Sequence, residues 1–227
     1  MRRAVLPFLL LAFAVRAEGL RVLELYTSQG CASCPPADRV IAKMADRPDV
    51  LALSFHVRWW DYLGWPDPFG LKVSGDRQRG YAKQWKLRHV FTPQVVVQGT
   101  TYGIGADEEE VATLLGAHPL VPEIPLMRQG TGLIANIPAL GLLRSAELWL
   151  LALDRRAATR VERGENADRT LVGVNIVRAA TPVSQVMETP MRVSLPTTIL
   201  AGHDIAVVLL QPPGPGPIAA AGRLALR

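Results

Sequence analysis

Hydrophobic runs separated by turn residues divide the first half of the chain into alternating strands and helices. Residues 22–26 and 50–55 are short apolar runs typical of buried strands. Between them, residues 37–45 place apolar side chains at the spacing of one helix face. A strand, a helix and a strand in this order predict a parallel crossover unit, the building block of an α/β sheet.

The pattern continues to about residue 117 with one more strand pair and two more helices. An aromatic-rich loop over residues 59–69 precedes a polar helix expected near residues 76–87. Residues 92–97 then predict a third strand, residues 101–104 a short fourth one, and residues 107–116 a last helix. The acidic start of that helix suits the positive end of a helix dipole.

Beyond residue 121 the sequence pattern changes to segments of alternating polar and apolar positions separated by turns. This pattern predicts an antiparallel β-sandwich of about 100 residues, with strands at residues 133–137, 147–153, 169–178, 192–195 and 205–210. All basic residues of this part are arginine. We therefore expect an α/β domain over residues 18–121 and an all-β, sandwich-like domain over residues 122–227.

The first 17 residues have the features of a cleavable export signal. Two arginines precede a short apolar run, and Val15-Arg16-Ala17 has small or branched residues at the two positions that a signal peptidase recognises at its cleavage site. The alternative, an N-terminal core helix, lacks a cap. The run is too short to span a bilayer, so we expect no stable membrane insertion after cleavage.

Removal of this segment changes the meaning of the overall charge. The chain carries a net charge of +5, which at first suggests a nucleic-acid partner. Three of those charges belong to the predicted signal peptide, and the remaining +2 offers no basis for nucleic-acid binding. The predicted location is periplasmic or extracellular, where disulfides persist.

The two cysteines of the chain carry its strongest chemical signal. Cys31 and Cys34 form a CxxC motif directly before the first predicted helix. Unpaired N–H groups at a helix start favour a thiolate, which predicts Cys31 as the attacking group and Cys34 as the resolving group. A CxxC motif also occurs in metal sites, but no second histidine lies at the ligand spacing of a structural zinc site.

The order of elements adds a second signal, Thr92-Pro93 before the third strand. A strand, CxxC, helix and strand, followed by a helix, Thr-Pro, two strands and a helix, resembles the thioredoxin fold over residues 20–117. In thioredoxin-like proteins the corresponding proline is cis, faces the dithiol and aligns the substrate backbone. The resemblance assigns that role to Pro93, with Thr92 beside it.

Six stretches make a closer resemblance, to a family of exported bacterial proteins known as domain of unknown function twelve-twenty-three. They read LELYTSQGCASCPPAD, LALSFHV, WWDYLGWPDPF, RQRGYAKQW, FTPQVVVQG and RGENADRTL. The resemblance implies a thioredoxin-like module followed by a β-rich part, with a redox-type motif. It implies no substrate.

Two polar residues on the predicted strands could serve the dithiol. Glu24 could shuttle the proton of Cys34, as an acid on the equivalent strand does in thioredoxins, or it could pair with an arginine or lie at an accessible strand end. His56 could act as an acid or base, join the cysteines as a soft-metal ligand, or only bind backbone.

Two loops have alternative interpretations. Trp59 and Trp60 belong to an aromatic loop that could bind an unfolded polypeptide beside Cys31, or could seal the end of the sheet. The segment 164–169 has the composition of a polar hairpin loop, and the family resemblance adds a partner or ligand role as an alternative.

Together these features predict an exported thiol–disulfide oxidoreductase that acts on protein thiols or disulfides and needs no organic cofactor. The alternatives are a carrier of copper or another soft metal, and an adaptor whose dithiol is a structural or regulatory clasp.

Overall fold

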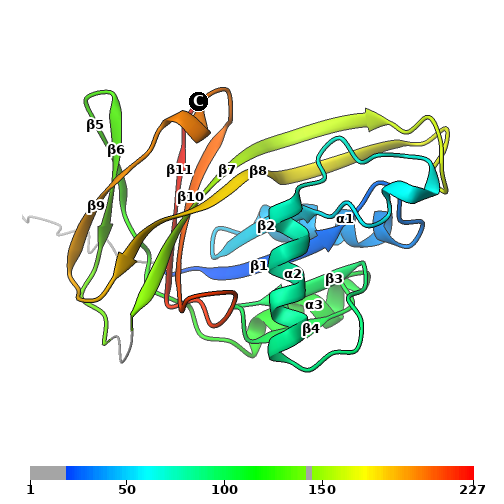
Figure 1. Ribbon diagram of the computed structural model, residues 1–227. Coiled ribbons are helices and arrows are strands. Elements are labelled where there is room, and N and C mark those ends of the chain that lie inside the picture. The colour runs from blue at the N-terminus through cyan, green and yellow to red at the C-terminus, as the bar shows by residue number, and fades with distance from the viewer. Residues whose placement is uncertain (1–18, 142–144) are drawn as a thin grey trace, which may run out of the picture.

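The computed structural model describes residues 19–141 and 145–227 (Figure 1). The predicted signal peptide lies outside the described residues. Among the helices of the described part, none is long and apolar enough to cross a membrane.

The first half follows the predicted order of elements. It contains β1 (Arg21–Thr27), α1 (Cys34–Ala45), β2 (Val50–His56), a short 3₁₀ turn η1 (Asp61–Leu63), α2 (Lys72–Gln84), β3 (Gln94–Val97), β4 (Thr101–Gly103) and α3 (Glu108–Gly116). Strands β1 and β2 pair in parallel through the predicted crossover, whereas β3 is antiparallel to both β1 and β4. Helix α2 begins four residues earlier than expected, because its first turn contains only one apolar side chain, Val73, and so shows no helical period.

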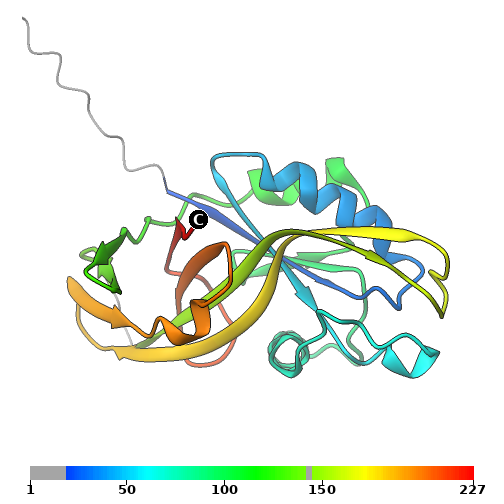
Figure 2. The ribbon, with the colours of Figure 1, turned by 90° about the horizontal axis from the view of Figure 1, so that it is seen from above.

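The helices cover both faces of this part of the sheet. Helices α1 and α3 lie on one face and α2 lies on the other (Figure 2). The alternation of side chains along β1 serves both layers, since Leu23 and Leu25 pack with α1 while Val22 and Tyr26 pack in the core that includes Tyr81 of α2. Position along β1 therefore decides which helix a side chain meets.

The second half is built of strands. It contains β5 (Leu126–Gln129), β6 (Gly132–Ile137), β7 (Ala146–Arg160), β8 (Thr170–Val186), β9 (Met191–Leu195), a 3₁₀ turn η2 (Thr198–Leu200), β10 (Ile205–Gln211) and β11 (Ala220–Ala225). The sequence pattern predicts neither β5 nor β11. Strand β5 has only one buried residue, and β11 consists mainly of small residues after a proline- and glycine-rich turn.

One large mixed sheet joins the two halves. Its strand order is β11-β10-β7-β8-β2-β1-β3-β4, and a separate three-stranded sheet has the order β5-β6-β9. The joint is a parallel pairing of β8 with β2 at Ser54 and Ile176. A second apolar core includes side chains of both sheets. The predicted α/β class is confirmed at this level, as a large mixed sheet with few helices.

The long β7–β8 ladder positions the site. These strands have 15 and 17 residues, far longer than the predicted segments. Their connection, residues 161–169, is called the hairpin tip below. Figures 1 and 2 show this tip at the end of the molecule where α1 begins.

Candidate functional site

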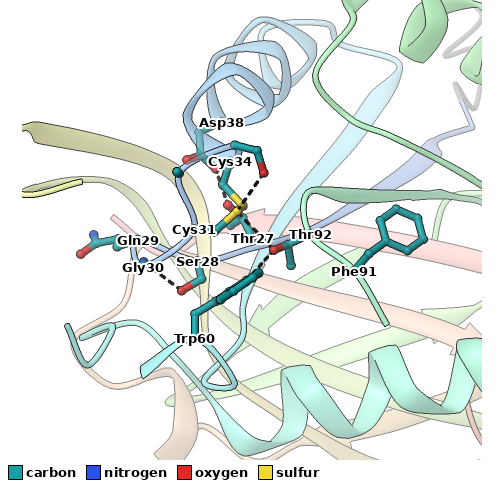
Figure 3. Close-up of a disulfide and its surroundings, with 12 residues drawn as sticks. Thr27, Ser28, Gln29, Gly30, Cys31, Cys34, Asp38, Trp60, Phe91 and Thr92 are labelled. Carbon is teal, nitrogen blue, oxygen red and sulfur yellow. Dashed lines mark hydrogen bonds between the residues drawn. A yellow bond between two sulfur atoms is a disulfide. The ribbon is translucent and has the colours of Figure 1, made fainter. Parts of the chain in front are cut away.

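The two cysteines lie at the N-terminus of α1, as the sequence predicted. Cys34 is the first residue of the helix, and the prolines that follow occupy its first turn. A disulfide joins Cys31 to Cys34, with 5.4 Å between their Cα atoms (Figure 3). Both residues are buried, with exposed fractions of 1% and 0%.

A chain of hydrogen bonds reaches the sulfur of Cys31 from the aromatic loop. The indole N–H of Trp60 donates to Thr92 Oγ1 at 2.7 Å, and Thr92 Oγ1 donates to Cys31 Sγ at 3.3 Å (Figure 3). Because the indole fills the acceptor side of the hydroxyl, its hydrogen is directed at the sulfur. The Thr92–Pro93 peptide bond is cis, which the thioredoxin resemblance implied.

Only one of the two predicted tryptophans of the substrate site takes part in this chain. Trp59 donates to Gln78 Oε1 at 3.2 Å and packs against Trp60 with 4.6 Å between ring centroids and the rings tilted by 31°. It holds the loop on α2. The loop comes close to the cysteines at Gly30, where a Cβ atom would meet Trp60 Cβ at 3.2 Å.

The hairpin tip binds the CxxC loop from the other side. Asn166, which is fully buried, donates from Nδ2 to the carbonyl oxygens of Gln29 and Cys31, both at 2.9 Å. The backbone N–H of Ala32 donates to Glu165 Oε2 at 3.1 Å. The sequence predicts a polar hairpin loop here, with a partner or ligand role as the alternative. It does not predict the bonds to the CxxC loop, since no local pattern links residues so far apart.

His56 forms a buried pair with Asp67. Its Nδ1 atom lies 2.7 Å from Asp67 Oδ2, which also accepts from the backbone N–H of Gln29 at 2.7 Å. Burial lowers the pKa of His56, but the Asp67 carboxylate outweighs burial and the pKa is raised above its usual value. Burial raises the pKa of Asp67, and the His56 pair outweighs it, so this pKa is lowered. The ion pair is therefore favoured.

Asp38 is a residue of the site that was not among the candidates predicted from the sequence. It lies one turn after Cys34 on α1, and Figure 3 shows it beside that cysteine. The hydroxyl of Thr27 donates to Asp38 Oδ1 at 2.8 Å. Burial raises the pKa of Asp38 to about 6. A signal was available, because residues i and i+4 share one helix face.

Glu24 lies in a buried polar cluster with an arginine and a tyrosine. Its carboxylate accepts from Arg77 Nε and Nη2, both at 2.7 Å, and from Tyr81 Oη at 3.0 Å. This cluster lies on the α2 face of β1, opposite to α1. Glu24 therefore pairs with an arginine, the alternative considered above, and nothing in this placement connects it to the proton of Cys34.

The soft-metal alternative depends on which ligand side chains the described residues bring together. Within residues 19–141 and 145–227, no group of three or more His, Cys, Asp or Glu side chains is placed to hold one. The soft-metal alternative would have to recruit two cysteines that form a disulfide here and a histidine whose Nδ1 is bonded to Asp67.

Comparisons with known proteins identify relatives of known structure. A family model described as "Protein of unknown function (DUF1223)" matches residues 22–211. No curated protein matches the chain. A crystal structure of a protein from Agrobacterium tumefaciens is 31% identical, covers 91% of this chain and 95% of its own, and superposes with a TM-score of 0.81.

A more distant structure shares the fold alone. HBP35 of Porphyromonas gingivalis superposes with a TM-score of 0.59 at 13% identity. The match covers 92% of this chain and 76% of that one.

Proposed function

The chain belongs to the DUF1223 family, whose description assigns no activity, and we propose that it is an exported thiol–disulfide oxidoreductase acting on protein thiols or disulfides. The observation that carries the proposal is the Cys31–Cys34 disulfide at a helix start, with the Thr92 hydroxyl directed at Cys31 Sγ.

In the reduced protein this environment favours a thiolate on Cys31. The N–H groups of the first helical turn have no partners within the helix and carry the positive end of its dipole. The Thr92 hydroxyl supplies a further donor. The thiolate attacks a substrate disulfide, and Cys34 then displaces the substrate thiolate from the mixed disulfide.

The finer fold assignment supports the same chemistry. We propose a thioredoxin-like unit over residues 18–121 and a sandwich-like unit over residues 122–227. In this arrangement Pro93, after its cis bond, aligns the substrate chain beside the dithiol. Export through the signal peptide, residues 1–17, would place the protein where disulfides form and exchange.

Access to the sulfur requires a local movement. Since Cys31 is 1% exposed, a substrate reaches it only after neighbouring side chains shift. Trp60 is the side chain best placed to move, because its ring stacks on the exposed Tyr62, with 6.3 Å between ring centroids. The shift would also break the hydrogen bond from Trp60 to Thr92.

Trapping of mixed disulfides tests the proposal. A Cys34→Ser variant expressed with its signal peptide should accumulate adducts with other proteins, which disappear on reduction. The matched control is Cys31→Ser, which keeps one thiol but lacks the attacking one and should trap no partner. Equal adduct levels for the two variants, or none for either, would contradict the enzyme assignment.

The burial of both sulfurs favours a second candidate, a structural clasp. A disulfide with exposed fractions of 1% and 0% could simply close the loop before α1. A clasp would resist exchange with glutathione buffers. An oxidoreductase would equilibrate with them. Quantifying the two redox forms after incubation in such buffers therefore separates the candidates.

A further inference from the structure

A polar cluster lies behind the disulfide, on the face of the sheet that α1 covers. The carboxyl ends of the parallel strands β1 and β2 place Thr27 and His56 opposite each other. Thr27 binds Asp38 at 2.8 Å, and His56 binds Asp67 at 2.7 Å. Asp38 and the His56–Asp67 pair thus meet at the first turns of the helix that carries Cys34.

Two observations indicate that this cluster is more than a structural bond network. The Nε2 atom of His56 is buried and has no hydrogen-bond partner. The adjacent strand β8 brings Gly173 over the ring, where a Cβ atom would lie 3.8 Å from Nε2. A polar atom buried without a partner is costly, so a mere packing role does not explain why a histidine occupies this position.

A groove connects Asp38 to solvent. It has a volume of about 230 Å³ and runs between the start of α1 and the start of β8. Asp38 lines it, together with Pro35, Arg39 and residues 169–172. Asp38 therefore lies between Cys34, one turn earlier on the same helix, and a groove that opens to solvent.

We propose that Asp38 accepts the proton of Cys34 when the mixed disulfide is resolved and releases it through this groove, with His56 and Asp67 as positioning residues. The inference rests on the proposed function. In the step, the Cys34 S–H bond breaks and its proton passes to the Asp38 carboxylate. The Cys34 sulfur bonds to Cys31 Sγ, and the bond from Cys31 to the substrate sulfur breaks, so that the substrate leaves as a thiolate.

The charges around Asp38 support an acceptor that works near neutral pH. Burial raises its pKa to about 6, while the cation on His56 lowers it. An acceptor of this strength is ionised at pH 7 and can still hold a proton transiently. The charged groups around the cluster are Arg39, His56, Asp67, Arg169 and Arg178. They come from α1, β2, the loop before α2, the hairpin tip and the middle of β8.

The reaction of the reduced protein with 5,5′-dithiobis(2-nitrobenzoic acid) separates the two steps. Attack by Cys31 releases one coloured thiolate, and resolution by Cys34 releases a second. We expect Asp38→Asn to leave the first phase unchanged, to slow the second roughly 100-fold at pH 7, and to abolish its inflection near pH 6. Asp46→Asn, an exposed position at the other end of α1, is the matched control.

A second variant tests the positioning role. His56→Gln removes the cation that faces Asp38, so the inflection of the second phase should move to higher pH. A purely structural histidine would change the amount of folded protein without moving the inflection. A wild-type second phase in Asp38→Asn would overturn the inference alone. No colour release from the wild-type protein would overturn the proposed function as well.

Discussion

Asn166 lies 135 residues after Cys31 in the chain, yet its side-chain amide donates a 2.9 Å hydrogen bond to the Cys31 carbonyl oxygen. The same amide binds the carbonyl of Gln29. The hairpin tip, at the end of the longest strand pair, therefore fixes the backbone of the CxxC loop. A segment of the second half of the chain is part of the site in the first half.

Asn166→Ala should loosen this loop and destabilise the protein. Two backbone carbonyls would lose their donor in a buried place, which corresponds to about 2–3 kcal/mol in the free energy of unfolding. Urea denaturation of the oxidised protein measures the change. Glu162→Gln, an exposed position in the same tip, is the control. Equal midpoints for the two variants would show that the tip does not hold the loop.

Thr92→Val should raise the pKa of Cys31 in the reduced protein. The valine keeps the shape of threonine but removes the donor 3.3 Å from the sulfur. Loss of one hydrogen bond to a thiolate raises its pKa by roughly one pH unit. The pH dependence of alkylation reports this value. Thr92→Ser keeps the hydroxyl and should behave as the wild type. If the pKa of Cys31 were identical in Thr92→Val and Thr92→Ser, the hydrogen bond from residue 92 would not stabilise the thiolate.

Local sequence patterns predict only some parts of the site. The positions of Cys31 and Cys34 followed from a strand, a helix and the spacing between the thiols, all of which are local. Thr92-Pro93 was found through the order of elements. That order is itself assembled from elements that each leave a local pattern in the sequence.

The missed contacts depend on pairings over long separations. The parallel register of β8 on β2 brings the hairpin tip to the CxxC loop, and β8 shares only the pairing of Ser54 and Ile176 with that strand. Short hydrophobic repeats specify that a strand forms, but not which neighbour it joins. For the same reason the pattern placed Glu24 on a buried strand without deciding which helix it faces.

Glu24→Gln should cost stability without changing the chemistry of the cysteines. The substitution leaves the buried Arg77 without its carboxylate, a change that typically costs about 3–5 kcal/mol. Thermal or urea unfolding measures the loss. The pH profile of both colour-release phases should stay that of the wild type, because Glu24 lies on the α2 face.

The double variant Glu24→Gln/Arg77→Met provides the control for that prediction. It removes the buried cation as well and should recover part of the lost stability. A shifted pH profile in either variant would return Glu24 to the role of proton shuttle.

Asp38→Asn should stabilise the protein at neutral pH, although it removes a hydrogen-bonded carboxylate. Burial raises the pKa of Asp38 from 3.8 to about 6, so between these values the folded chain keeps a proton that the unfolded chain has lost. Its contribution to stability is present below about pH 4 and is lost as the pH rises through about 6. Ionised Asp38 then costs about 1–2 kcal/mol, since contact with the groove reduces the full effect.

Asparagine keeps the oxygen that accepts from Thr27 and never ionises. The variant should therefore match the wild type at pH 4 and exceed it by that amount at pH 7.5, in urea unfolding of the oxidised protein. The control Asp46→Asn should show no such pH-dependent difference. Asp38→Asn could instead be less stable than the wild type by the same amount at both pH values. The Asp38 carboxylate would then serve only as a structural acceptor of the Thr27 hydrogen bond. Its pKa would not be raised, and it would not be suited to take a proton from Cys34.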